Sequence, residues 1–186
     1  MNRKDIKRLA LDHLVSSTAM LAASQPFFAF ADNILVKLPY SVSINNRFLS
    51  VGTTLVGLGI AVTKLREKSQ NYFEIDTSKR NSRLTAHDLL YGATISAVLA
   101  PIFYSIAGGQ NLAELVYTTA AAIGINAAIS PLNFYTVDVF RDYAGIKQTE
   151  YLPPSLKNIR HSTKKYFLGL TATASFTIVS GLYALR

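Results

Sequence analysis

The sequence contains no cysteine, and only 16% of its residues are charged. The lack of cysteine excludes disulfides, thiolate metal ligands and a cysteine nucleophile. Three scattered histidines, His13, His87 and His161, predict no metal cluster. A nucleophile elbow, a phosphate-binding loop, an HExxH sequence and a dinucleotide fingerprint are missing as well. We therefore expect no metal, no cofactor and no enzymatic activity.

Apolar residues dominate what remains. The chain has 186 residues, of which 49% are hydrophobic, and its mean hydropathy is +0.22. This composition is too apolar and too sparsely charged for an ordinary soluble domain. The formal net charge of +8 would favour a nucleic-acid partner if the bases covered a polar surface. They lie between apolar blocks instead, so we expect a membrane protein that binds no nucleic acid.

Five stretches are suited to crossing a bilayer, whose core requires about 20 mostly apolar residues per helix. They cover residues 9–31, 48–65, 89–107, 112–140 and 166–185. The basic start resembles a signal peptide, but the apolar stretch continues past Phe30 without a cleavage site, so we expect a retained helix. Because the fourth stretch is long for one straight span and contains Pro131, we expect a kink there or an interfacial first turn. The sequence predicts an all-α, polytopic membrane helical bundle, a single integral membrane domain over residues 1–186.

The positions of lysine and arginine predict the orientation, since basic flanks stay in the cytoplasm. Sixteen of the 19 bases precede the first stretch or lie in the loops after the second and the fourth. The other three are Lys37, Arg47 and Arg186. We expect a multi-pass protein of the inner membrane with a cytoplasmic N-terminus and an external C-terminus. Anionic lipid headgroups are the expected contact of the bases.

The first four stretches show an internal repeat. A shift of about 75 residues aligns Asp12 with Asp88 and Arg66 with Arg141. Pro26 and Pro101 also align, and each precedes its arginine by 40 residues. The sequence therefore predicts two tandem two-helix repeats, at about 9–68 and 85–144, followed by a C-terminal helix at about 164–186. Parallel repeats of this kind are typical of transporters.

Charged residues at the edges of the spans are the first candidates for function, because ionisable groups are costly in a membrane. Asp12 and Asp88 open the first and third spans, and Asp138 lies near the end of the fourth, three residues before Arg141. We expect these four to be proton or gating sites. The alternative is structural: an aspartate stabilises the positive end of a helix dipole, and an Asp-x-x-Arg pair forms a local ion pair.

The fourth span carries a polar face, because Asn126, Ser130 and Asn133 stand at i, i+4 and i+7. Such a face next to a proline is typical of the broken helices at which transporters bind small zwitterions. We expect substrate to bind there. The alternative is that these side chains only hydrogen bond to a neighbouring helix, which stabilises by about 0.6 kcal/mol on average.

Two polar residues from other spans complete the predicted substrate site. Gln25 is the one strongly polar uncharged side chain in the outer half of the first span, and Arg47 directly precedes the second. A guanidinium fork can bind a substrate carboxylate, although an arginine at this level can also extend to lipid headgroups. The fifth span has small residues at four-residue spacing, Gly169, Thr173, Thr177 and Gly181, so we expect it to pack or to form a homo-oligomer.

With these residues placed, residues 9–143 resemble the small bacterial inner-membrane L-alanine exporter family. The likeness rests on short motifs: Asp12, Arg47, Arg66-Glu67, Asp88, and Asp138 or Asp142. It implies a four-span exporter that moves alanine outward with the proton gradient. The chain departs from the family in its fifth span, in the glycines of its second span, and in having Gln25 where an acidic residue is expected.

We therefore expect a small secondary transporter, a proton-coupled exporter of a small zwitterionic substrate such as L-alanine. Two alternatives remain open. A non-transporting membrane scaffold is favoured if the polar residues of the fourth span only join helices. A lipid-modifying enzyme is favoured if Asp12 and Asp88 converge at the headgroups.

Overall fold

The computed structural model describes residues 2–108 and 111–185, so Arg186 lies outside the described residues. In this part of the chain, five helical segments are long and apolar enough to cross a membrane. The first joins α1 (Arg3–Phe30) to the π-helical η1 (Ala31–Leu35), and the second joins α2 (Tyr40–Thr53), the π-helical η2 (Thr54–Leu58) and α3 (Gly59–Tyr72). The others are α4 (Ser82–Ile106), α5 (Leu112–Tyr143) and α7 (His161–Ala184), with the short α6 (Pro154–Lys157) before α7. The predicted all-α bundle of membrane helices is confirmed.

The first two spans are longer than predicted. The first continues to Leu35, and the second runs from Tyr40 to Tyr72 rather than over residues 48–65. Hydropathy placed Asp32 and Arg47 outside the spans because both are charged. In the structure both are buried inside the bundle, where side chains from other helices take the place of water.

The helix is broken in the second span and not at Pro131, because α5 continues through this proline as one helix. At Gly57 the backbone has φ 157° and ψ −16°, a conformation that requires glycine. Carbonyls at the break bind side chains of α1. Ser17 Oγ donates to the Thr54 carbonyl at 2.9 Å, and His13 Nε2 lies 2.6 Å from the Leu55 carbonyl.

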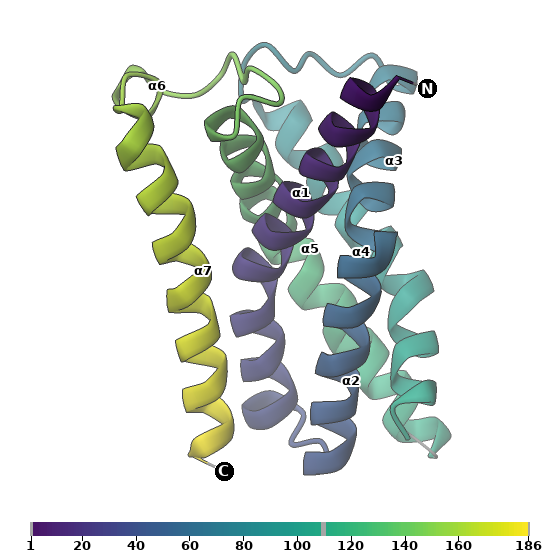
Figure 1. The fold of residues 1–186 in the computed structure, drawn as a ribbon. Coiled ribbons are helices and arrows are strands. Elements are labelled where there is room, and N and C mark those ends of the chain that lie inside the picture. The colour runs from purple at the N-terminus through teal and green to yellow at the C-terminus, as the bar shows by residue number, and fades with distance from the viewer. Residues whose placement is uncertain (1, 109–110, 186) are drawn as a thin grey trace.

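The two ends of the bundle differ (Figure 1). One end, here the N-terminal end, carries the N-terminus, α6 and the loops 73–81 and 144–153. The other, the C-terminal end, carries the C-terminus and the turn between η1 and α2. The helix α7 stands at the edge of the bundle and packs against α1. The termini therefore lie at opposite ends, as an odd number of spans requires.

Close packing of α4 on α5 positions the polar face of α5. A Cβ atom at Gly92 would overlap the Ser130 side chain, so only glycine permits this approach. Asn126 Nδ2 donates to the Gly92 carbonyl at 2.8 Å. Small residues and polar contacts of this kind hold helices together in a bilayer.

Candidate functional site

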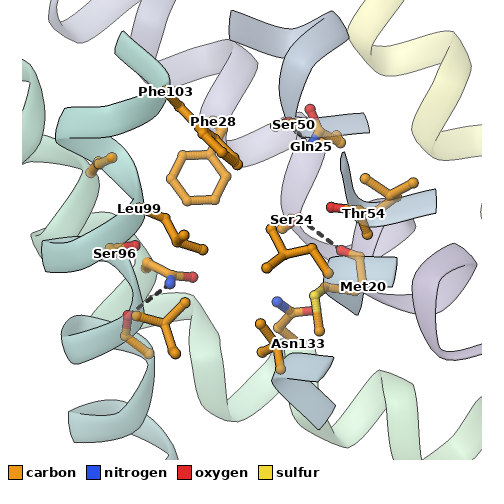
Figure 2. A pocket seen from close by; sticks show the side chains of 18 of the residues that line it. Met20, Ser24, Gln25, Phe28, Ser50, Thr54, Ser96, Leu99, Phe103 and Asn133 are labelled. Atoms are coloured by element: carbon orange, nitrogen blue, oxygen red, sulfur yellow. Dashed lines mark hydrogen bonds between the residues drawn. The ribbon is translucent and has the colours of Figure 1, made fainter. Parts of the chain in front are cut away.

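A cavity of about 130 Å³ lies between α1, α2, α4 and α5. All five predicted substrate-binding residues line it, and they come from three of the helices: Gln25, Arg47, Asn126, Ser130 and Asn133. Figure 2 shows side chains around this space, among them Gln25, Asn133 and Ser96, together with the aromatic rings of Phe28 and Phe103. The mixture of apolar walls with a few polar groups is typical of small-molecule sites.

The three polar residues of α5 have different surroundings. Ser130 Oγ donates to Asn126 Oδ1 at 3.4 Å, and Asn126 is bonded to α4. These two residues fit the alternative interpretation, in which polar side chains join helices. Asn133 differs, because it is buried and its Oδ1 atom has no hydrogen-bond partner among the described residues.

Two more buried polar atoms at the cavity lack a partner among the described residues. They are Oδ1 of Asn46 and Nε of Arg47, both on α2. With Asn133 Oδ1, residues that line the cavity thus carry two unpaired acceptors and one unpaired donor. An unmade hydrogen bond on a buried group costs about 1–3 kcal/mol, so a ligand with complementary groups would gain that energy on binding.

Arg47 joins the cavity to an ion network at the C-terminal end. Its Nη2 atom binds Asp32 Oδ2 at 3.0 Å, and its Nη1 atom donates to Gln25 Oε1 at 3.3 Å. Asp32 also accepts a hydrogen bond of 2.8 Å from the Tyr104 hydroxyl. Arg47 is buried within this network. Arg47 therefore does not extend to lipid headgroups, which was the other interpretation of the sequence.

Arg66 organises a second network at the N-terminal end. Its Nε and Nη2 atoms bind the two oxygens of Asp88 at 2.7 and 2.8 Å, a bidentate pair, and its Nη1 atom binds Asp138 Oδ2 at 3.1 Å. The Tyr151 hydroxyl, from the loop after α5, donates to the same Asp138 oxygen. Burial and the charge of Asp138 raise the pKa of the Tyr151 phenol, so Tyr151 remains a donor even in alkaline solution.

Arg141 organises a third network at the same end. Its Nε atom lies 2.8 Å from Asp12 Oδ1, and its Nη1 atom binds Glu67 Oε1 at 2.8 Å. Lys64 and Lys147 extend the network to Asp12 and Glu67, at 3.3 and 3.0 Å. Three helices, α1, α3 and α5, are thereby tied together by charges.

The structure does not fit the structural alternative for the charged candidates, a helix-dipole contact or a local ion pair. Asp12 and Asp88 bind arginines of other helices, and neither stands in the first turn of its own helix. Asp138 and Arg141 do not form the predicted local pair, because they belong to different networks. The four predicted gating residues therefore lie in two interhelical networks, away from the cavity lining.

Several residues of the site were not identified from the sequence. Asp32 and Asn46 were placed outside the spans, and Tyr104 and Tyr151 carry no sequence signal beyond their residue type. Arg66 was noted in the repeat but not as a site residue. Its alignment with Arg141 is the one signal that could have found it, since a repeat that predicts a role for one arginine predicts it for both.

No family model, curated protein or solved structure matches this sequence. Among the described residues, histidine and acidic side chains form no group that could hold a metal ion. The functional argument therefore rests on the cavity and its networks.

Proposed function

We propose that the chain is a small secondary transporter and that its solute binds in the cavity between α1, α2, α4 and α5. The observation that carries the proposal is that three buried polar atoms, on Asn46, Arg47 and Asn133, have no hydrogen-bond partner in the part of the chain that the structure describes. Such groups are costly in a protein that only joins helices, whereas a ligand that bonds to them would offset this cost.

The chemistry of the cavity favours a small zwitterion. The Arg47 donor suits a carboxylate, and the amide oxygens of Asn46 and Asn133 suit an ammonium group. An apolar cavity of about 150 Å³ accepts benzene, and L-alanine has the same number of non-hydrogen atoms. The volume of about 130 Å³ and the resemblance to L-alanine exporters both support a solute of this size. Outward, proton-coupled transport is part of the same proposal.

The ion networks support the repeat that we propose for residues 9–144. Asp12 of the first half binds Arg141 of the second, and Asp88 of the second half binds Arg66 of the first. The aspartate of each half therefore binds the arginine of the other half, as a pseudo-twofold arrangement predicts.

The scaffold alternative has an observation in its favour. Asn126 and Ser130 are engaged in contacts within and between helices, which a scaffold would also make. The lipid-modifying enzyme requires Asp12 and Asp88 to share a reaction space, whereas each binds a different arginine.

Uptake and counterflow of radiolabelled L-alanine in proteoliposomes, with and without a pH gradient, test the proposal. We expect gradient-dependent flux, and we expect Asn133→Leu to weaken binding about 10- to 100-fold, because it removes a hydrogen bond to a charged group. Thr136→Val is the matched control: Thr136 lies on the same helix, donates to its own Leu132 carbonyl and does not line the cavity.

Normal flux in a folded Asn133→Leu protein would remove α5 from the substrate site. Absence of flux in the folded, unmodified protein, with L-alanine and with other small zwitterions, would favour the scaffold.

A further inference from the structure

A second hollow, here called the vestibule, opens at the N-terminal end. It has a volume of about 440 Å³ and is bordered by α3, α5 and the loops 73–81 and 144–153. Its wall is mostly polar and includes Arg66, Asp138, Lys147 and Tyr151. Among the described residues, it shares no lining residue with the cavity.

A cation–π contact joins the walls of the two hollows. Arg66 lines the vestibule, Phe134 lines the cavity, and the guanidinium carbon of Arg66 lies 4.5 Å from the centre of the Phe134 ring. Such a contact is strongest where water is excluded. Phe134 is only 3% exposed, and Arg66 only 2%. Phe134 and Arg66 are therefore in direct contact between the cavity on one side and the vestibule on the other, and we call this pair the partition.

Neighbouring residues hold both parts of this partition. The Phe134 ring packs against Tyr91 of α4, with ring centres 5.6 Å apart. Arg66 is held by Asp88 and Asp138. Tyr151, on the loop beside the vestibule, binds the Asp138 oxygen that Arg66 also binds. A loop at the surface is thus connected through one carboxylate to the partition.

We propose that Phe134 and Arg66 form the barrier that closes the cavity toward the N-terminal end, and that Tyr151 latches this barrier from the loop. Displacing the Phe134 ring joins the two hollows, and releasing Tyr151 frees Asp138 and loosens Arg66. Phe134 and Tyr151 thereby act as gate residues. The role of the barrier in solute passage rests on the proposed function, whereas its effect on access to the cavity does not.

The absence of cysteine from the sequence allows a direct test of access. Ser96→Cys places a thiol in the cavity wall, and Ser78→Cys places one in the vestibule wall. In lipid nanodiscs, a charged methanethiosulfonate reagent should modify the thiol of Ser78→Cys rapidly and the thiol of Ser96→Cys slowly. Adding Phe134→Ala to Ser96→Cys should raise the rate about tenfold, the scale of a lost cation–π contact. Tyr151→Phe should raise it about threefold.

Phe27→Ala is the matched control, because Phe27 is an aromatic residue of α1 that is 43% exposed and lines neither hollow. Circular dichroism verifies that each variant is folded. An unchanged rate in folded Phe134→Ala would overturn the barrier. If Phe134→Ala does not fold, Tyr151→Phe decides, since it removes a single oxygen atom; an unchanged rate would then overturn the latch and the barrier held by it. If Phe134→Ala speeds labelling but the unmodified protein transports neither L-alanine nor other small zwitterions, the barrier is kept and the transporter is rejected.

Discussion

At the scale of single residues, carboxylates take the place of water around the buried guanidinium groups of Arg66 and Arg141. Arg66 is 2% exposed and has contacts with two aspartates. Leaving one member of a buried ion pair without its partner costs about 3–5 kcal/mol, more than the net stability that an intact pair contributes. The networks therefore make the arrangement of the helices specific, because any other arrangement leaves a charge unpaired in a bilayer.

Asp88→Asn should consequently destabilise the protein by about 3 kcal/mol, the lower end of this range, because Arg66 keeps Asp138. Asp76→Asn is the control. Asp76 lies in the exposed loop, where hydrogen bonds from Ser78 lower its pKa, and a change at so exposed a position is expected to have much less effect on stability than one inside the bundle. Thermal unfolding in detergent, followed by circular dichroism, measures both. Equal midpoints for the two variants would show that the Arg66 network does not stabilise the fold.

At the scale of elements, the second span has the most irregular backbone. It is interrupted at η2, where Gly57 has a backbone conformation that side chains disfavour, and Gly59 packs directly on Ser17 of α1. Gly52, two turns earlier, has no atom within 4 Å of its would-be Cβ. Three glycines of one span thus have three different roles.

Replacing each of two glycines by alanine tests this difference. Gly59→Ala should destabilise the protein by about 1–3 kcal/mol, because its methyl group must displace Ser17 from a close packing contact. Gly52→Ala should stabilise it by about 0.5–1 kcal/mol, the usual difference between these residues inside a helix. Urea or thermal unfolding of both variants in the same detergent gives the comparison. Stabilisation by Gly59→Ala would mean that α1 and the second span are not packed as described.

At the scale of the whole molecule, the bases are distributed unequally. The N-terminal end carries both long loops and their lysines and arginines. Since basic loops remain in the cytoplasm, we predict that this end faces the cytoplasm.

Alkaline phosphatase, which is active only outside the cytoplasm, reports on this orientation. Fused after Leu185, at the C-terminal end, it should be active. Fused after Asn158, which follows α5 and precedes α7, it should be inactive, because that chain has one span fewer. The opposite pair of activities would invert the assigned orientation.

Prediction from sequence was most successful where a periodic pattern carried the information. The helical face of Asn126, Ser130 and Asn133 was placed on the cavity because spacing alone defines a helix face. Hydropathy could not place Asp32 inside the first span, because its burial depends on Arg47 and Tyr104 from other helices. Likewise, Pro131 gave the stronger local signal of a break, yet the break occurs at Gly57, where α1 supplies Ser17 and His13 to the carbonyls.

The break at Gly57 also divides the second span into two helices, α2 and α3, that are joined by one hinge. The helix α2 carries Arg47, which binds Asp32, and the helix α3 carries Arg66, which binds Asp88. In a straight, stiff helix the two arginines would move as one body. A change in the backbone torsion angles of Gly57 can tilt one of these helices while the other stays in place. If the chain is the transporter that we propose, such independent movement would let one end of the cavity open while the other stays closed, so that solute passes without an open leak through the membrane.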